Sequence, residues 1–236
     1  GTLQPMSQLG ELCRRRGVPL HTDAVQAVGH VPVDAAAQNI DMLSLSAHKF
    51  HGPKGVGALY CRAGVPLSIF LEGGAQERGL RGGTENVPAI AGMAAALEEA
   101  CCRMEEDARR VSAMGEALAE ALSRIPRSHR NGGGPDSLPG IINFSFAGVE
   151  GEALVQMLDQ AGICASSGSA CTSGSLDPSH VLLALGLSPA AARGSLRFSL
   201  SRYNTMAEVE AVELYRLRAG GEVLPAMVRR LRELSV

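Results

Sequence analysis

The sequence predicts an α/β fold, and three features of the 236-residue chain support this prediction. Short apolar runs of strand length alternate with longer segments whose apolar residues recur at helical spacing, a pattern typical of a sheet covered by helices. Turns rich in glycine and proline separate these segments. Hydrophobic residues make up 45% of the chain and charged residues 19%, which indicates a buried core rather than a disordered polymer.

The elements of the first half follow from this periodicity. A helix is expected over residues 6–16, where Met6, Leu9 and Leu12 share one face and Gly17 ends the helix. The elements expected next are three strands (18–22, 41–46 and 55–60), a short helix (34–39), an irregular glycine-rich stretch (71–86) and a long helix (87–125) with a break near 104–107.

The second half begins after a loop over residues 127–139, in which Asn131-Gly-Gly-Gly-Pro135 predicts a break. Thr205 and Glu208 form a capping box, which predicts the start of a helix that Gly220-Gly221 ends. The other elements expected are strands (141–146, 163–165 and 195–199), a helix (151–161) and a final amphipathic helix (223–234). We predict two domains, residues 1–106 and residues 107–236, joined by the long helix.

Composition disfavours several classes of partner. The formal net charge is −2 and no run of Lys or Arg occurs, so a nucleic-acid partner is not expected. No apolar stretch reaches the roughly 18–20 residues that span a bilayer, and no signal peptide is recognisable, so no membrane partner and a cytoplasmic location are expected. The six cysteines include no C-x-x-C pair, so no metal site is expected. Most of them are predicted to be buried: Cys13, Cys61, Cys101, Cys102 and Cys164.

Lysine is rare in this chain. Lys49 and Lys54 are the only two lysines among 22 basic residues, so chemistry that needs a primary amine must use this short segment. Lys49 follows a predicted strand, and the rim of a sheet is where α/β proteins bind ligands. A lysine in such a place is more often a solvated surface residue, but its neighbours favour a cofactor site.

Those neighbours have the chemistry that pyridoxal phosphate (PLP) requires. Asp23 ends the preceding strand, and a carboxylate beside a pyridine nitrogen keeps that nitrogen protonated. Gln26 could donate a hydrogen bond to a ring oxygen. Ser46 and His48 bracket the lysine with donors suited to a phosphate.

Several motifs then resemble one family. They are His21-Thr-Asp-Ala-Val-Gln-Ala-Val-Gly29, Ser46-Ala-His-Lys49, Gly52-Pro-Lys-Gly55, Gly73-Gly-Ala-Gln-Glu-Arg-Gly-Leu-Arg-Gly-Gly-Thr84-Glu-Asn86, Ala165-Ser-Ser-Gly-Ser-Ala-Cys171 and Leu196-Arg-Phe-Ser199. Together they resemble the PLP-dependent cysteine desulfurases of the NifS/IscS type, in the class V aminotransferase group. The resemblance implies a fold-type I PLP-dependent transferase. Residues 1–106 would be the C-terminal portion of its large cofactor domain, and residues 107–236 a small α+β domain with a mobile cysteine loop.

The resemblance also implies a role for each matched residue. Lys49 would hold the cofactor covalently, with Asp23 on the ring nitrogen and Gln26 on the phenolic oxygen. Ser46 and His48 would bind the phosphate, His48 also serving in catalysis. Thr84 would reach the cofactor phosphate of a second subunit, so a homodimer is expected.

The substrate residues implied by the resemblance lie further along the chain. Arg197 would bind the substrate carboxylate, for which a planar guanidinium is well suited, and Asn143 would line the site. Cys171 would be the nucleophile, in a polar loop where a thiol ionises more readily than in a core. The implied reaction converts L-cysteine to L-alanine and leaves a persulfide on Cys171. A sulfur-acceptor protein would take the sulfur for iron–sulfur cluster or thio-cofactor synthesis.

Gly1-Thr-Leu-Gln-Pro5 resembles the end of a longer family segment, so an N-terminal truncation is expected. The absent part would supply half of the cofactor pocket, and the isolated chain is expected to bind PLP poorly. Two alternatives stay open: a selenocysteine lyase or other class V lyase, and a non-catalytic scaffold.

Overall fold

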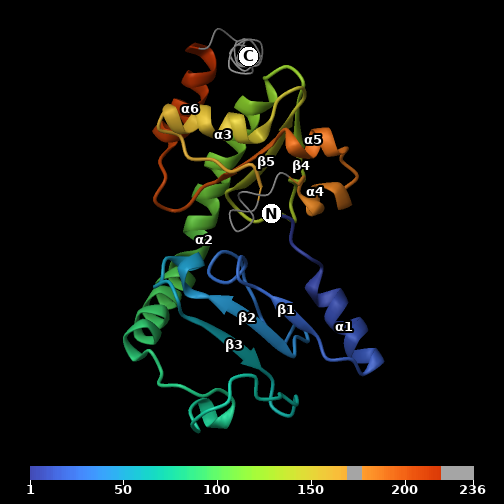
Figure 1. Cartoon of the computed structure of the whole chain (residues 1–236), viewed down its shortest axis with the longest axis vertical. Coiled ribbons are helices and arrows are strands. Elements are labelled where there is room, and N and C mark those ends of the chain that lie inside the picture. Colours follow the sequence, from blue (N-terminus) through green and yellow to red (C-terminus); the bar gives the residue numbers. More distant parts are fainter. Residues whose placement is uncertain (169–176, 219–236) are drawn as a thin grey trace. The chain divides into compact units, whose positions relative to one another are not determined.

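The computed structural model describes residues 1–168 and 177–218 (Figure 1). The chain divides into two compact units, one formed by Gln4–Glu106 and the other by Asp107–Val236 together with Gly1–Leu3. Each unit has its own three-stranded sheet and its own apolar core. Within the described ranges, no helix has the length and apolar character needed to cross a bilayer.

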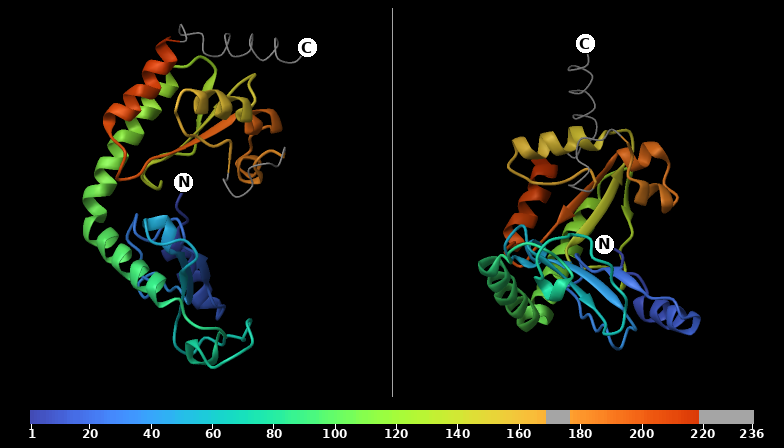
Figure 2. Two further views of the ribbon diagram at one scale, coloured as in Figure 1. Left: turned by 60° about the vertical axis from the view of Figure 1, so that its left-hand side comes forward. Right: turned by 60° about the horizontal axis from the view of Figure 1, so that its bottom comes forward.

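The sheet of the Gln4–Glu106 unit is mixed. Its strands are β1 (His21–Asp23), β2 (Met42–Ser46) and β3 (Gly57–Cys61), in the order β1-β2-β3. β1 runs parallel to β2, with Asp23 opposite Ser44, and β3 runs antiparallel to β2 (Figure 2). The three strands predicted from the sequence are therefore present: β1 and β3 have both ends shifted, whereas β2 begins one residue later than predicted and ends where predicted.

Helices and turns join these strands. α1 (Met6–Arg16) has the predicted limits, and Gly17 ends it in the left-handed conformation with φ 66°. A single turn of 3-10 helix, η1 (Ala47–Phe50), follows β2, and a second one, η2 (Glu77–Gly79), lies in the irregular stretch that the glycines predict.

Two expectations about helices are wrong. Residues 34–39 form turns rather than a helix: Asp34 Oδ1 accepts the N–H groups of Ala36 and Ala37, and Asn39 leaves helical geometry with φ 53°. The long helix α2 (Val87–Ser123) has no break near 104–107. Met, Glu and Asp in that stretch are compatible with a helix, and neither Gly nor Pro occurs there.

The other unit contains an antiparallel sheet of β4 (Ser128–Asn131), β5 (Ile141–Phe146) and β6 (Ser195–Ser199). β5 and β6 have the predicted limits, but β4 lies where a loop was expected. Its sequence, Ser-His-Arg-Asn, has no apolar alternation that would predict a strand. One face of the sheet carries Phe144, Phe146 and Phe198, which are buried in the core with one side of α2.

The remaining helices are α3 (Gly151–Gln160), α4 (His180–Ala184), α5 (Pro189–Arg193) and α6 (Met206–Arg218). α4 and α5 are too short for the periodicity to have predicted them. The strand expected at 163–165 is absent, and only Ser166 pairs, by a single bridge to Arg197. The capping box is confirmed, since Thr205 N–H donates to Glu208 Oε2 at 2.8 Å. This hydrogen bond lowers the pKa of Glu208.

The predicted burial of the cysteines is wrong in part. Cys101, Cys102 and Cys164 are exposed, whereas Cys13 and Cys61 are half-buried. The end of α6 predicted at Gly220-Gly221, the amphipathic helix at 223–234 and the loop that carries Cys171 lie outside the described residues.

Candidate functional site

The carboxyl ends of β1 and β2 bring the predicted cofactor residues to one edge of a sheet. Asp23 is the last residue of β1 and Ser46 the last of β2, and the two strands are parallel with Asp23 opposite Ser44. η1 follows Ser46 directly and contains His48 and Lys49. A carboxylate, a hydroxyl, an imidazole and an amine therefore gather at the edge where α/β sheets bind ligands.

Burial within η1 decides which of its side chains are available. Ala47 and Phe50 are fully buried, so the turn is anchored by its two ends, while His48 is exposed and Lys49 half-buried. The N–H of Gly52 donates to the carbonyl of Ala47 at 2.8 Å and closes the turn. The anchored backbone fixes where the Lys49 side chain starts.

Gly29 lets Phe50 approach the turn after β1. A Cβ at Gly29 would lie 2.9 Å from Phe50 Cβ, closer than real contacts allow, and the backbone there has φ 81°. Both the close approach and the positive φ require glycine. This explains the glycine that ends the His21–Gly29 motif, because it allows the segment after Asp23 to pack on the turn that carries Lys49.

Asp23 is exposed, and its carboxylate is oriented by its own turn. Oδ1 accepts the N–H of Val25 at 3.0 Å, and Ala24 N–H continues the ladder to Ser44 O at 3.0 Å. Within the described part of the chain, no cation forms an ion pair with this carboxylate. It is therefore available to accept a hydrogen bond from a protonated ring nitrogen, and the donor set at this edge fits PLP. Gln26, also exposed, lies in the turn that follows.

A half-buried histidine, His30, lies close to His51, the residue that ends η1. Burial lowers the pKa of His30, and the nearby His51 lowers it further when charged. His51 ends η1 in the left-handed conformation, with φ 67°. A neutral imidazole is thus favoured at His30, beside the turn that carries Lys49.

Thr84 is exposed at the end of an arch formed by residues 71–84. Gly82 N–H donates to Leu71 O at 2.9 Å, and the side-chain oxygen of Gln76 accepts Gly83 N–H at 3.2 Å. A Cβ at Gly82 would lie 2.8 Å from Gly73 Cα, so the two arms of the arch approach closely only because both residues are glycine.

The predicted substrate residues belong to the other unit and lie side by side in its sheet. Arg197 of β6 is opposite Asn143 of β5. The Nε of Arg197 is buried and has no hydrogen-bond partner among the described residues. A cation held in this way is suited to an anionic ligand, because burial without a partner is costly.

Ser166 connects Arg197 to the segment that leads to Cys171. The two residues exchange both backbone hydrogen bonds, at 2.6 and 3.1 Å, and the Ser166 hydroxyl donates to Gly168 O at 2.9 Å. Cys171 itself is not among the residues that the structure describes. The described geometry therefore places the start of its segment against the strand that carries the predicted substrate arginine.

The sequence does not point to Asn131, because the surrounding residues 127–139 predict a loop. Its Nδ2 donates to Asn143 Oδ1 and to Ser145 Oγ, both at 2.7 Å, and its Oδ1 is buried without a partner. The Asn that opens an Asn-Gly-Gly-Gly run was visible in the sequence, but only the sheet register shows that it ends a strand beside Asn143.

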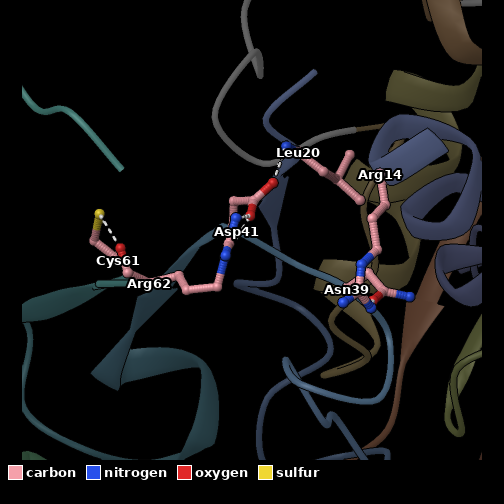
Figure 3. A network of polar contacts seen from close by, with 6 residues as sticks. All are labelled: Arg14, Leu20, Asn39, Asp41, Cys61 and Arg62. Atoms are coloured by element: carbon pink, nitrogen blue, oxygen red, sulfur yellow. Dashed lines mark hydrogen bonds and ion pairs between the residues drawn. The ribbon is translucent and has the colours of Figure 1, made fainter. Parts of the chain in front are cut away.

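A second polar network lies at the opposite ends of the strands and is structural. Asp41 precedes β2, and its Oδ2 accepts the N–H of Leu20 at 2.7 Å while Oδ1 accepts Arg62 Nε at 2.7 Å (Figure 3). These hydrogen bonds hold the pKa of Asp41 below its usual range, and the bond from Leu20 has the larger effect. A cavity of about 370 Å³ borders this network. The network ties the amino ends of β1 and β2 together, away from the cofactor edge.

Comparison with known proteins identifies the family. Residues 1–212 match the model of the family described as Aminotransferase class-V. A cysteine desulfurase IscS of Methanosarcina thermophila is 48% identical over 235 residues, which cover 100% of this chain and 56% of that protein. The chain thus spans about half the length of the curated relatives it matches.

Solved structures of similar fold support the same family. A NifS-like protein superposes with a TM-score of 0.83 at 37% identity, over 91% of this chain and 56% of that one. A structure described as SspA in complex with cysteine has a TM-score of 0.68 at 37% identity, over 87% of this chain and 56% of that one. The fold is therefore that of fold-type I PLP-dependent enzymes, and the two sheets are parts of that fold. On these sequence and structural grounds, the chain belongs to the class-V aminotransferase family.

Proposed function

We propose that the protein containing this chain is a PLP-dependent cysteine desulfurase, which converts L-cysteine to L-alanine and carries the sulfur as a persulfide on Cys171. The observation that carries the proposal is the meeting of Asp23 and the Lys49 turn at the carboxyl edge of two parallel strands. The likeness to proteins named cysteine desulfurase supports the choice of reaction.

The residues at this edge would hold the cofactor by complementary chemistry. Lys49 would bind it through its amine, Asp23 would accept a hydrogen bond from its ring nitrogen, and Gln26 would donate to its ring oxygen. Ser46 and His48 would donate to its phosphate. When bound, PLP supplies an electron sink that stabilises negative charge on the substrate α-carbon. Lys49, released by the incoming amine, would move the proton of that carbon.

Arg197 would bind the substrate carboxylate. Its Nε lacks a partner among the described residues, and a guanidinium keeps its charge at every physiological pH. Asn143, opposite it in the sheet, would line the same site. Fixing the carboxylate leaves the substrate thiol as the end that faces the enzyme nucleophile.

Sulfur transfer needs no external oxidant. The thiolate of Cys171 would attack the substrate sulfur, so that one S–S bond forms while the carbon–sulfur bond breaks. The electron pair of the broken bond stays with the carbon skeleton, which takes up protons and leaves as alanine. The persulfide on Cys171 then passes its outer sulfur to an acceptor protein that serves iron–sulfur cluster or thio-cofactor synthesis.

Assembly and location complete the proposal. The exposed Thr84 arch is available to a second copy of the chain, consistent with a homodimer whose sites are shared. Residues 1–106 would belong to the large cofactor domain and residues 107–236 to the small domain. We place the enzyme in the cytoplasm, since persulfide chemistry needs reduced thiols and all five described cysteines are free.

The two lysines provide a matched test of cofactor binding. In the longest natural polypeptide that contains these 236 residues, Lys49→Ala should abolish the visible absorption of lysine-bound PLP and its retention through gel filtration. Lys54→Ala changes the only other lysine of the 236 residues, which is exposed in the following turn, and should keep both. Equal cofactor retention and equal absorption in the two variants would refute the assignment of Lys49.

A further inference from the structure

Three strands of the Asp107–Val236 unit align one polar residue each. Asn131 of β4 is opposite Asn143 of β5, and Asn143 is opposite Arg197 of β6. Residues directly opposite one another in a sheet project from the same face, so the three side chains form a row. The neighbours along β5, Ile142 and Phe144, project from the other face into the core. The row therefore belongs to a polar face that turns away from the core.

Asn131 binds the side-chain oxygen of Asn143. Both hydrogens of its Nδ2 are used, one on Asn143 Oδ1 and one on Ser145 Oγ, each at 2.7 Å. An amide whose oxygen is held on one side presents its NH₂ group on the other. In strand order that other side is β6, which carries Arg197. Among the described residues, Asn143 Nδ2 donates no hydrogen bond, and Arg197 Nε also lacks an acceptor.

Where Asn143 and Arg197 lie next to each other, the row therefore presents only N–H donors to a ligand. A carboxylate has two oxygens that accept several hydrogen bonds, and donors without acceptors select it over a neutral group. If the two amides were reversed, Asn143 would turn its oxygen towards the ligand and repel a carboxylate. The orientation of one amide thus decides whether this residue helps or hinders anion binding.

We propose that Asn131 is a positioning residue for carboxylate recognition: it fixes the amide of Asn143 so that Asn143 and Arg197 together bind the substrate carboxylate. This inference rests on the proposed function, because it assumes that Arg197 binds that carboxylate. Asn131 itself need not touch the substrate.

A double-mutant cycle tests whether Asn131 acts through Asn143. In the longest natural polypeptide that contains this chain, Asn131→Ala and Asn143→Ala should each raise the KM for L-cysteine about tenfold, with kcat changed by less than about threefold. The double variant should lose no more than the larger single loss, because the second change removes a group that is already misplaced. Gln156→Ala, at an exposed position on α3, is the control and should leave KM unchanged.

An isosteric variant guards against misfolding. In Asn131→Asp, the carboxylate can accept only, so Asn143 must turn its NH₂ towards residue 131 and its oxygen towards Arg197. The KM should rise more than in Asn131→Ala, while the melting temperature stays closer to that of the unmodified enzyme. The ratio of the inhibition constants for L-alaninamide and L-alanine should fall towards one, because the receptor no longer favours a carboxylate.

Each outcome has one meaning. Unchanged KM and an unchanged inhibitor ratio in Asn131→Asp, or single effects that multiply in the double variant, would overturn the inference and leave the proposed function standing. A lower melting temperature with an unchanged inhibitor ratio would show that Asn131 is only a structural residue. If the unmodified enzyme forms no alanine from cysteine, the proposed function itself fails.

Discussion

Cys171 is the residue on which the proposed sulfur transfer depends, and Cys164 is its natural control. Both thiols lie in the same stretch of sequence, and Cys164 is free and exposed. Since Cys164 also has a free, exposed thiol, the proposal of Cys171 as nucleophile depends on its access to the bound substrate.

The Cys171→Ser variant should release alanine from L-cysteine at least about a hundredfold more slowly, since a hydroxyl cannot accept the sulfur. Cys164→Ser should retain the rate of the unmodified enzyme. Alanine release and the persulfide content of the protein, measured by alkylation and mass spectrometry, check both results. Retained persulfide on Cys171→Ser would exclude Cys171 as the carrier.

Single elements show which parts of the structure the sequence could predict. β5 and β6 have their predicted limits because each alternates apolar and polar residues, and α1 ends at a glycine that adopts φ 66°. The edge that unites Asp23 and Lys49 was likewise expected, since both follow apolar runs. The chemistry of the neighbouring residues predicts Gln26, Ser46 and His48 as further cofactor residues, and only Thr84 depends on the motif match.

What the sequence did not predict has a physical reason in each case. β4 has no apolar alternation, because only its pairing with β5 stabilises it, and the role of Asn131 depends on that pairing. The exposure of Cys101, Cys102 and Cys164 depends on tertiary packing, which periodicity does not define. The free Nε of Arg197 could not be foreseen either, since it requires knowing what surrounds the side chain.

The turn that carries Lys49 should depend on Gly29. In Gly29→Ala the new Cβ would meet Phe50 at 2.9 Å and the backbone at φ 81° would be strained, so we expect a loss of roughly 2–3 kcal/mol in the free energy of unfolding. Gly17→Ala has a similar φ of 66° but nothing within 4 Å, and should cost only about 1 kcal/mol.

The difference between the two glycine variants isolates the contact with Phe50 from backbone strain. Urea denaturation gives the free energies of unfolding, and the affinity for PLP, measured in the longest natural polypeptide that contains the chain, gives the effect on the turn. PLP should bind more weakly to Gly29→Ala only. Equal losses in both variants would show that the contact has no part in placing η1.

On the scale of the whole molecule, stability should fall at mildly acidic pH. The pKa of His30 is lowered in the folded state by burial and then by His51. The unfolded chain therefore binds a proton more readily than the folded one, and this contribution to stability, present above the normal histidine pKa near 6.5, is lost as pH falls through the folded pKa.

We expect the urea midpoint to decrease between pH 7.5 and pH 5.5, and His30→Gln to reduce that dependence. His180→Gln, at an exposed position on α4, should leave the dependence as it is. An identical pH profile for His30→Gln and the unmodified chain would show that the proton is taken up elsewhere.

The order β1-β2-β3 has a practical consequence for work with the 236-residue polypeptide. Within the described residues only β2 of this sheet is paired on both sides, so β1 and β3 each keep a row of backbone groups without a strand partner. β3 also exposes Leu59 and Tyr60, at 50% and 41% of their surface. Open, partly apolar edges bind other chains without selectivity. Concentration-dependent light scattering by this polypeptide would therefore report adhesion between sheet edges, and a native dimer should be sought with a method that identifies the residues in contact.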